Sequence, residues 1–253
     1  MVLSRLFRKP LQPSVPAGVR VYAVGDIHGR LDLLNLILEL LVEDLERRPV
    51  ERPPVIVFLG DYIDRGPESR GVIDRLLALQ VDPRFEVVTL RGNHEQFLLD
   101  FLDDRATSGG AWMSYGGLST LDSYGIAPPA LRTDAEAWTS TAEALRQAVP
   151  AAHLAFLEAT TFTYLCGDYL FVHAGVRPGQ PLDRQTPADL TQIRQPFLGA
   201  REPLRGKVVV YGHTVVEAPL IERWKIGLDT GAFATGRLTV MRFEGSRKDH
   251  LTT

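Results

Sequence analysis

The chain has 253 residues, of which 45% are hydrophobic and 23% charged, and its formal net charge at pH 7 is -3. This composition is typical of a globular protein that buries a sizeable core, and it lacks the basic excess of nucleic-acid-binding domains. No apolar stretch is long enough to span a membrane, so we expect neither a nucleic-acid nor a membrane partner.

The single cysteine, Cys166, excludes an intrachain disulfide and favours a reducing, cytoplasmic location. It lies in an apolar run, which predicts a small buried hydrophobe and not a reactive thiol. Residues 1–18 are expected to form a flexible tail, because the basic start has no long apolar region of a signal peptide. The alternative is a contact with a membrane surface through Leu3, Leu6 and Phe7.

The first half of the chain repeats one pattern of strand, polar loop and helix. Short apolar runs predict strands at 19–24, 55–59 and 86–90. Apolar residues at helical spacing follow each run, as at Leu31, Leu34, Leu38, Leu41 and Leu45. This repeat is typical of a parallel sheet with helices packed on its faces.

The middle of the chain, residues 105–158, has a different character. Paired glycines flank Trp112 and Tyr115, which favours irregular backbone. Helical patterns are predicted at 134–149 and 151–158. We interpret the segment as an inserted cap over the ends of the sheet, and the alternative is a helical hairpin with no role in substrate binding.

The last third is predicted to add strands at 162–166, 169–172, 207–211, 225–229 and 237–242. Gly167-Asp168 gives the first two a hairpin turn. A short helix is expected near 187–193, and residues 246–253 are expected to form a tail. The sequence thus predicts one mixed, two-sheet α/β domain over 19–245.

Polar side chains cluster where the predicted strands end. An acidic loop after a buried strand is costly unless its carboxylates meet cations. Asp26 and His28, two residues apart, are expected to share one face of extended backbone. Four of the six histidines lie in these loops, and mixed nitrogen and oxygen ligands suit Mn, Fe or Zn. The candidate residues are Asp26, His28, Asp61, Asp64, Asn93, His94, His173 and His213.

Five motifs occur in order: Gly25-Asp26-Ile27-His28-Gly29, Gly60-Asp61-Tyr62-Ile63-Asp64-Arg65-Gly66, Gly92-Asn93-His94-Glu95, His173-Ala174-Gly175 and Gly212-His213. Over residues 19–243 the chain resembles the bacterial and phage type of the phosphoprotein phosphatase branch of the calcineurin-like metallophosphoesterases. Asp64-Arg65-Gly66 is the stretch that points to this branch. The resemblance implies a two-sheet β-sandwich flanked by helices.

The resemblance also implies roles for individual residues. Two divalent ions, Mn²⁺ first and Fe or Zn as alternatives, would be held by Asp26, His28, Asp61, Asn93, His173 and His213, with Asp61 shared. His94 would donate a proton and Asp64 would orient it. Arg65, Asn93 and a second arginine, Arg194, would bind the phosphate, and Arg91 and Arg177 are rivals of Arg194.

The implied reaction is hydrolysis of a phosphomonoester by a hydroxide that bridges the two metal ions. A phosphoprotein or a small phosphorylated molecule is the expected substrate, and serine/threonine phosphatase activity is favoured over tyrosine. One alternative is a symmetrical dinucleoside tetraphosphate hydrolase, although that relative lacks a counterpart of Asp64. Another is a non-catalytic binding protein that keeps its metals for structure. His153 and His250 match no motif and are interpreted as ordinary surface or helix residues.

Overall fold

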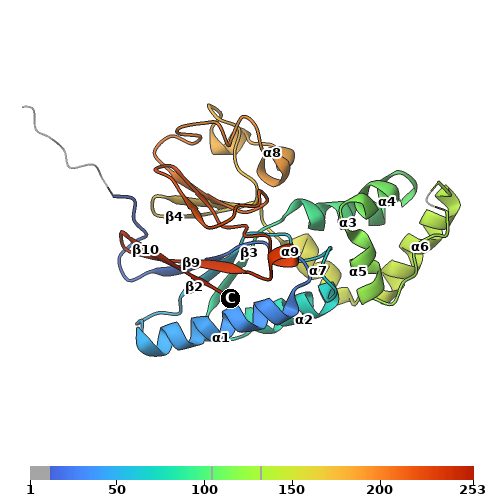
Figure 1. The fold of residues 1–253 in the computed structure, drawn as a ribbon, viewed down its shortest axis with the longest axis horizontal. Coiled ribbons are helices and arrows are strands. Elements are labelled where there is room, and N and C mark those ends of the chain that lie inside the picture. The colour runs from blue at the N-terminus through green and yellow to red at the C-terminus, as the bar shows by residue number, and fades with distance from the viewer. Residues whose placement is uncertain (1–11, 104, 132) are drawn as a thin grey trace, which may run out of the picture.

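The computed structural model describes residues 12–103, 105–131 and 133–253, with side chains of 105–108 left out. Two five-stranded sheets face each other and helices flank them (Figure 1). The predicted mixed two-sheet α/β fold is therefore confirmed.

The first sheet has the order β10-β9-β1-β2-β3. Its strands alternate between two cores: Val21 and Ala23 pack against the other sheet, whereas Tyr22 and Val24 pack against helices. This period of two is the one that a sheet buried on both faces requires. The strands β1 (Arg20–Val24), β2 (Val55–Phe58) and β3 (Glu86–Thr89) are parallel, and β9 (Thr239–Glu244) and β10 (Arg247–Thr252) are antiparallel.

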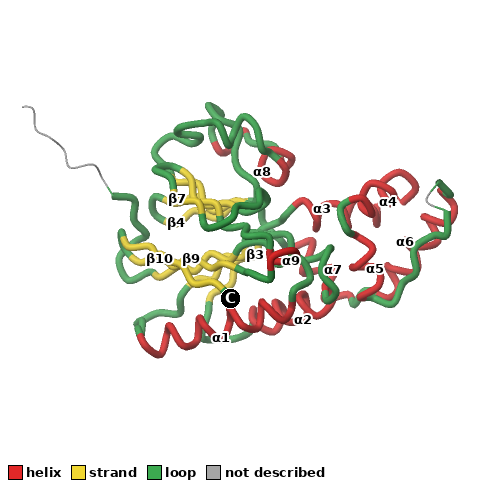
Figure 2. Tube along the Cα trace, viewed as in Figure 1, coloured by secondary structure: helices red, strands yellow, loops and turns green. Residues whose placement is uncertain are grey.

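Two helices, α1 (Leu31–Arg47) and α2 (Ser69–Gln80), cover the outer face of this sheet (Figure 2). Leu34, Ile37 and Leu41 of α1 are fully buried. Their spacing of three and four residues puts them on one side of the helix, as the sequence predicts. Full burial of each such side chain stabilises the fold by about 1.5–3 kcal/mol.

The second sheet has the order β4-β5-β6-β8-β7. Phe171 and Val210 from this sheet meet Phe243 of β9 in the core between the sheets. The elements are β4 (Thr163–Cys166), β5 (Tyr169–Val172), η1 (Leu182–Arg184), α8 (Pro187–Gln192), β6 (Val208–Tyr211), β7 (Leu220–Ile221), β8 (Lys225–Gly227) and α9 (Ala232–Thr235). Cys166 is buried, as predicted.

A helical region extends beyond one end of the sheets (Figure 1). Two of its helices were not expected from the sequence, since glycines masked their pattern. Trp112 is fully buried and Trp138 is 2% exposed, and both pack on Phe101. The helices are α3 (Asn93–Asp103), α4 (Arg105–Ser114), α5 (Gly117–Ser123), α6 (Ala135–Ala148) and α7 (Ala151–Ala159).

The expected C-terminal tail is a strand, and the described end of the expected N-terminal tail packs against the domain. Residues 247–252 form strand β10, whose charged side chains hide any apolar alternation and suit an exposed sheet edge. Residues 1–11 lie outside the described part of the chain. The residues that follow are held in place: Ser14 N donates to Asp168 Oδ2 at 3.0 Å, and Val15 is 2% exposed.

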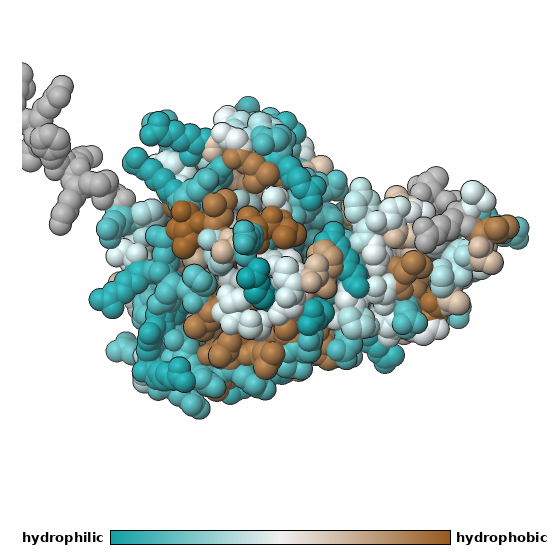
Figure 3. All heavy atoms as spheres, viewed as in Figure 1, coloured by the Kyte–Doolittle hydropathy of each residue, from teal (hydrophilic) through white to brown (hydrophobic). Residues whose placement is uncertain are grey.

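His153 was interpreted as an ordinary surface or helix residue, and it lies on α7 but is buried. Its Nδ1 is 2.8 Å from the Tyr124 hydroxyl and its Nε2 is 2.9 Å from Asp74 Oδ1. Within the described residues, no helix combines the length and the apolarity needed to cross a bilayer. Figure 3 shows that hydrophilic residues cover much of the visible face, with hydrophobic residues in separate groups.

Candidate active site and metal centre

The loops after β1, β2, β5 and β6 and the start of α3 bring the predicted site residues together. Their backbone is unusual. Among the described residues, five that are not glycine have a positive φ, and all five belong to these loops: His28, Asp61, Asp64, Arg65 and His213. Left-handed backbone at such residues costs free energy and is concentrated at functional sites, because the surrounding structure must enforce it.

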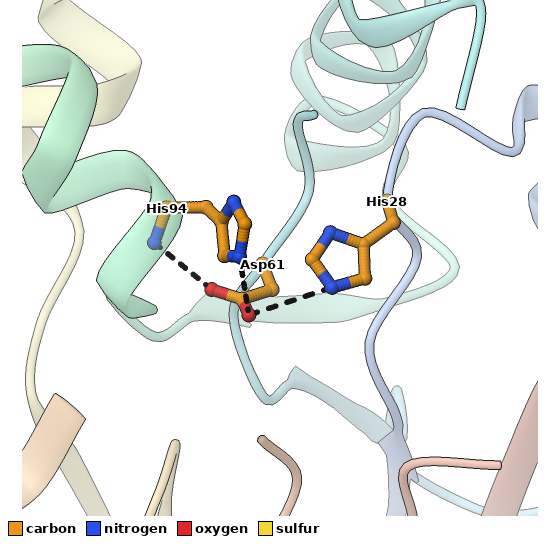
Figure 4. Close-up of side chains that lie close together, drawn as sticks. All are labelled: His28, Asp61 and His94. Carbon is orange, nitrogen blue, oxygen red and sulfur yellow. Dashed lines mark hydrogen bonds and ion pairs between the residues drawn. The ribbon is translucent and has the colours of Figure 1, made fainter. Parts of the chain in front are cut away.

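Asp61 lies at the centre of the cluster. Its Oδ2 is 3.6 Å from His28 Nε2 and 3.8 Å from His94 Nε2, and its Oδ1 accepts the His94 backbone N–H at 3.1 Å (Figure 4). These three side chains form one group that could hold a metal ion. His94, which the resemblance assigns to proton donation, is thus also close to this position.

A second group shares Asp61 and adds His173 and His213. His173 Nε2 lies 3.4 Å from Asp61 Oδ1 and 3.1 Å from Asn93 Oδ1. The other nitrogen of His173, Nδ1, is 2.8 Å from the carbonyl of Leu59, which fixes the ring orientation. The shared carboxylate therefore faces two candidate cation positions.

Asp26 belongs to neither group of three. Its Oδ2 accepts the backbone N–H of His213 at 2.9 Å, which places it beside the second group. The expectation of extended backbone from Asp26 to His28 is wrong, because His28 adopts a φ of 47° in a turn. The spacing of two residues between Asp26 and His28 in the sequence does not reveal this turn.

Two atoms of the cluster are buried without a hydrogen-bond partner: Asp26 Oδ1 and His213 Nε2. Buried polar atoms are normally paired, and an unpaired carboxylate oxygen and an unpaired imidazole nitrogen in one cluster fit the ligands of a cation. A Cβ at Gly212 would lie only 2.1 Å from Asp26 Oδ1, so the glycine allows this close approach. The residues therefore fit divalent metal ions.

Electrostatics support the same conclusion. Burial, together with Asp229 and Asp61, raises the pKa of Asp26 well above its usual value. Burial lowers the pKa of His28 and of His213 to about 3, so both imidazoles are neutral at pH 7. Neutral imidazole is the form that ligates metals, and a bound cation would relieve the repulsion between the carboxylates.

Glu95 fixes the loop that carries Asp61. This fully buried carboxylate accepts backbone N–H groups of Asp61, Tyr62 and Gly92 at 2.8–2.9 Å. Burial, and then the charge of Asp61, raises the pKa of Glu95 to about 7. The last residue of the Gly92-Asn93-His94-Glu95 motif was not assigned a role from the sequence, and here it holds the backbone of Asp61.

His94 and Asp64 form a buried pair, with 2.7 Å between Nδ1 and Oδ2. Although burial lowers the pKa of His94, the charges of Asp61 and Asp64 raise it above its usual value. Two residues of the helical region hold Asp64: Trp112 Nε1 donates to Oδ2 at 2.8 Å, and Thr120 Oγ1 donates to Oδ1 at 2.6 Å. Sequence reasoning missed both, because no motif marks them.

The arginines differ in their freedom to bind an anion. Arg65 is exposed, with Nη2 3.3 Å from His94 Nε2 and its guanidinium 4.6 Å from the centre of the Phe233 ring. Arg194 is also exposed and its Nη2 lies 3.4 Å from the carbonyl oxygen of His213. Arg177 pairs with Asp189 at 2.6 Å, and Arg91 bonds to Thr160, which weakens the case for these two rivals.

Residues 19–229 match the model of the calcineurin-like phosphoesterases. The chain belongs to this family. Its members are metallophosphoesterases, which agrees with the motifs and with the cluster around Asp61. The family resemblance inferred from the sequence is therefore confirmed.

Two relatives and one solved structure illustrate the range of similarity. A "Bis(5'-nucleosyl)-tetraphosphatase PrpE [asymmetrical]" of Halalkalibacterium halodurans is 26% identical over 238 residues, 87% of this chain and 88% of that protein. A "Putative serine/threonine-protein phosphatase" of Caenorhabditis elegans is 37% identical over 75 residues, 30% of this chain and 19% of that protein. The crystal structure of "a putative diadenosine tetraphosphatase" shares 22% identity and a TM-score of 0.62, covering 94% of this chain and 98% of that one, and supports the fold.

Proposed function

We propose that this chain is a metal-dependent hydrolase of phosphomonoesters in which His94 protonates the leaving oxygen. The buried pair of His94 and Asp64, 2.7 Å apart beside Asp61 and Arg65, is the observation that carries this proposal. A carboxylate partner orients an imidazole and raises its pKa, which suits a proton donor at neutral pH. The favoured substrates are phosphoproteins and small phosphorylated molecules.

Asp26, His28, Asp61, Asn93, His173 and His213 would hold two divalent ions. When bound, such ions polarise phosphoryl oxygens and lower the pKa of water. Mn²⁺ is the first choice for this mixed nitrogen and oxygen donor set, with Fe and Zn as alternatives.

The remaining groups bind and orient the substrate. Arg65, near His94, and Arg194, near His213, are exposed donors that would hold phosphate oxygens together with Asn93. In the reaction, the oxygen of water bonds to phosphorus and the bond from phosphorus to the leaving oxygen breaks. His94 gives its proton to that oxygen, the attacking water releases one proton to solvent and His94 takes one back, so the products are inorganic phosphate and an alcohol.

Replacement of the proton donor tests the proposal. His94→Asn should lower turnover of an alkyl phosphate by about 10²–10⁴-fold. The loss should be much smaller for a phosphate with a nitrophenolate leaving group, which needs no proton. Mn²⁺ binding, measured by calorimetry, should persist.

His153→Asn is the matched control, since His153 is another buried histidine paired with a carboxylate, Asp74, away from the site. Its turnover per folded molecule should remain that of the unaltered protein. Equal turnover of the alkyl phosphate by His94→Asn and the unaltered protein would reject the assigned role.

The second candidate is hydrolysis of dinucleoside tetraphosphates. The relative that matches 87% of this chain carries that name, which supports the candidate. Competition between a phosphopeptide and a dinucleoside tetraphosphate separates the two: the preferred substrate has the larger kcat/KM with Mn²⁺ present. Serine/threonine phosphopeptides are the first to test, because the partial match to a serine/threonine phosphatase includes that name.

A further inference from the structure

An aromatic pair, formed by an exposed tyrosine and a half-buried phenylalanine, borders the candidate active site. Tyr115, in the turn between α4 and α5, stacks on Phe97 of α3 with ring centres 4.7 Å apart and planes at 22°. Tyr115 is 48% exposed. The His94 ring lies 5.9 Å from Phe97 and 6.3 Å from Tyr115, centre to centre, and meets the latter edge-on at 87°.

The turn that carries Tyr115 is hydrogen-bonded to the backbone of Arg65, the residue proposed above to bind phosphate. The carbonyl of Gly116 accepts the Arg65 backbone N–H at 3.2 Å, and Ser119 Oγ donates to the Arg65 carbonyl at 3.1 Å. Gly116 has a φ of 105°, and a Cβ there would lie 2.8 Å from Arg65 Cγ. Tyr115 therefore keeps a constant position relative to Arg65 and His94.

A tyrosine ring exposed beside a proton donor and an arginine is placed to contact whatever leaves the phosphorus. The leaving oxygen must come within hydrogen-bond reach of His94, about 2.6–3.2 Å, during protonation. A ring bonded directly to that oxygen would fall within stacking or edge-on distance of Tyr115, roughly 4.5–7 Å between centres. An alkyl chain at the same place gains less, because it offers no flat face.

Resting on the proposed function, we infer that Tyr115 and Phe97 form a binding surface for the aromatic ring of aryl phosphomonoesters. Phosphotyrosine in a peptide and free aryl phosphates share this chemistry. A nucleobase does not meet the requirement, since a ribose and a methylene group separate it from its phosphate. The surface thus favours phosphotyrosine over phosphoserine or phosphothreonine in a phosphoprotein, which reverses the order of preference expected from the sequence.

Substrates and variants can be matched to test this inference. Phenyl phosphate is compared with an alkyl phosphate, and a phosphotyrosine peptide with a phosphoserine peptide of the same sequence. Tyr115→Ala should lower kcat/KM for the two aromatic substrates about 3- to 10-fold. It should leave the two aliphatic substrates within a factor of two, and Tyr115→Phe should retain full activity on all four.

Leu118→Ala is the control, because Leu118 is an exposed apolar residue of the neighbouring helix α5. It should change none of the four values. Each variant is compared with the unaltered protein on its own substrate, so the greater intrinsic reactivity of aryl esters cancels.

Binding gives a readout independent of turnover. In the Mn²⁺-loaded protein, phenylphosphonate should bind more tightly than propylphosphonate, and Tyr115→Ala should remove most of that difference. An equal loss for aromatic and aliphatic substrates, or none for either, would overturn the inference. So would a loss confined to a dinucleoside tetraphosphate, which would make the surface a nucleobase site.

The two proposals fail in distinguishable ways. If the unaltered protein hydrolyses no phosphomonoester, the proposed function is rejected and the inference with it. If it hydrolyses phenyl phosphate and Tyr115→Ala does so equally well, only the inference is rejected.

Discussion

Buried charged residues cluster at both ends of strand β1, and the two clusters differ in how their charges are paired. At its start, Arg242 Nη1 lies 2.7 Å from Asp44 Oδ1, and the Tyr22 hydroxyl donates to Asp44 Oδ2 at 2.6 Å. Arg20 Nη2 lies 3.0 Å from Glu244 Oε1, and of the three side-chain nitrogens of Arg20 only Nε has no hydrogen-bond partner. Opposite charges thus satisfy one another within the chain.

Beyond the end of β1, carboxylates face carboxylates. The charges of Asp229 and Asp61 help to raise the pKa of Asp26, and the charge of Asp61 helps to raise the pKa of Asp229. Asp26 Oδ1 has no hydrogen-bond partner. A buried charge without a partner is costly, so a cation bound from solution would stabilise this cluster. The first cluster is paired within the fold, whereas the second is suited to binding a cation.

The largest effect should come from the shared carboxylate of the second cluster. Asp61→Asn removes the charge that both candidate metal positions face, so Mn²⁺ binding should fail. Metal assistance supplies several kcal/mol, and turnover should therefore fall roughly 10³-fold or more. Calorimetry and a phosphatase assay measure the two losses.

Asp44→Asn is the matched control at the first cluster, since it removes a buried aspartate charge far from the loops. Its Mn²⁺ affinity should be unchanged. If Asp44→Asn weakened Mn²⁺ binding as much as Asp61→Asn, the division between the two clusters would be untenable.

The next effect concerns stability. Asp44→Ala removes the carboxylate bound to Arg242 Nη1, which leaves this buried guanidinium paired only with Asp249, and the Tyr22 hydroxyl loses its acceptor. Removing one partner of a buried ion pair costs about 3–5 kcal/mol of unfolding free energy. Urea denaturation of the metal-free protein checks this value, while kcat at low temperature should stay unchanged. A free-energy loss below 1 kcal/mol would show that the cluster contributes little.

The smallest effect tests a link between the helical region and the site. Trp112→Phe and Thr120→Val each remove a hydrogen bond to the charged Asp64, worth about 1.5–3 kcal/mol. Turnover of alkyl phosphates should fall roughly tenfold or more in each variant. Thr141→Val is the control: this threonine of α6 donates its hydroxyl to the carbonyl of Ala137 in the same helix, and its replacement should have no such effect. Unaltered turnover in both Trp112→Phe and Thr120→Val would show that these hydrogen bonds to Asp64 do not support catalysis.

The sequence was informative where periodicity or motif carried the signal. Short apolar runs predicted β1, β2 and β3, and helical spacing predicted α1, α2, α6 and α7. The expected metal ligands come together around Asp61 and beside Asn93, with Asp26 outside both groups of three. Clustered strand-end residues are predictable because parallel strands carry their loops to one edge.

Other features left no such signal. Strand β10 pairs through its backbone at an exposed edge, so its side chains need no apolar pattern. The contacts of Trp112 and Thr120 with Asp64 join residues about fifty positions apart and depend on helix packing. The turn at His28 also escaped prediction, because its positive φ is imposed by neighbouring loops and not by residue type.

The left-handed backbone at His28, Asp61, Asp64, Arg65 and His213 has a consequence for laboratory evolution. Glycine adopts this conformation without steric penalty, so glycine substitutions at these positions would relieve stored strain. A library screened only for resistance to heat should therefore accumulate such glycines and lose hydrolysis at the same time. Screens that aim to raise the thermal stability of this protein therefore need an activity assay in every round.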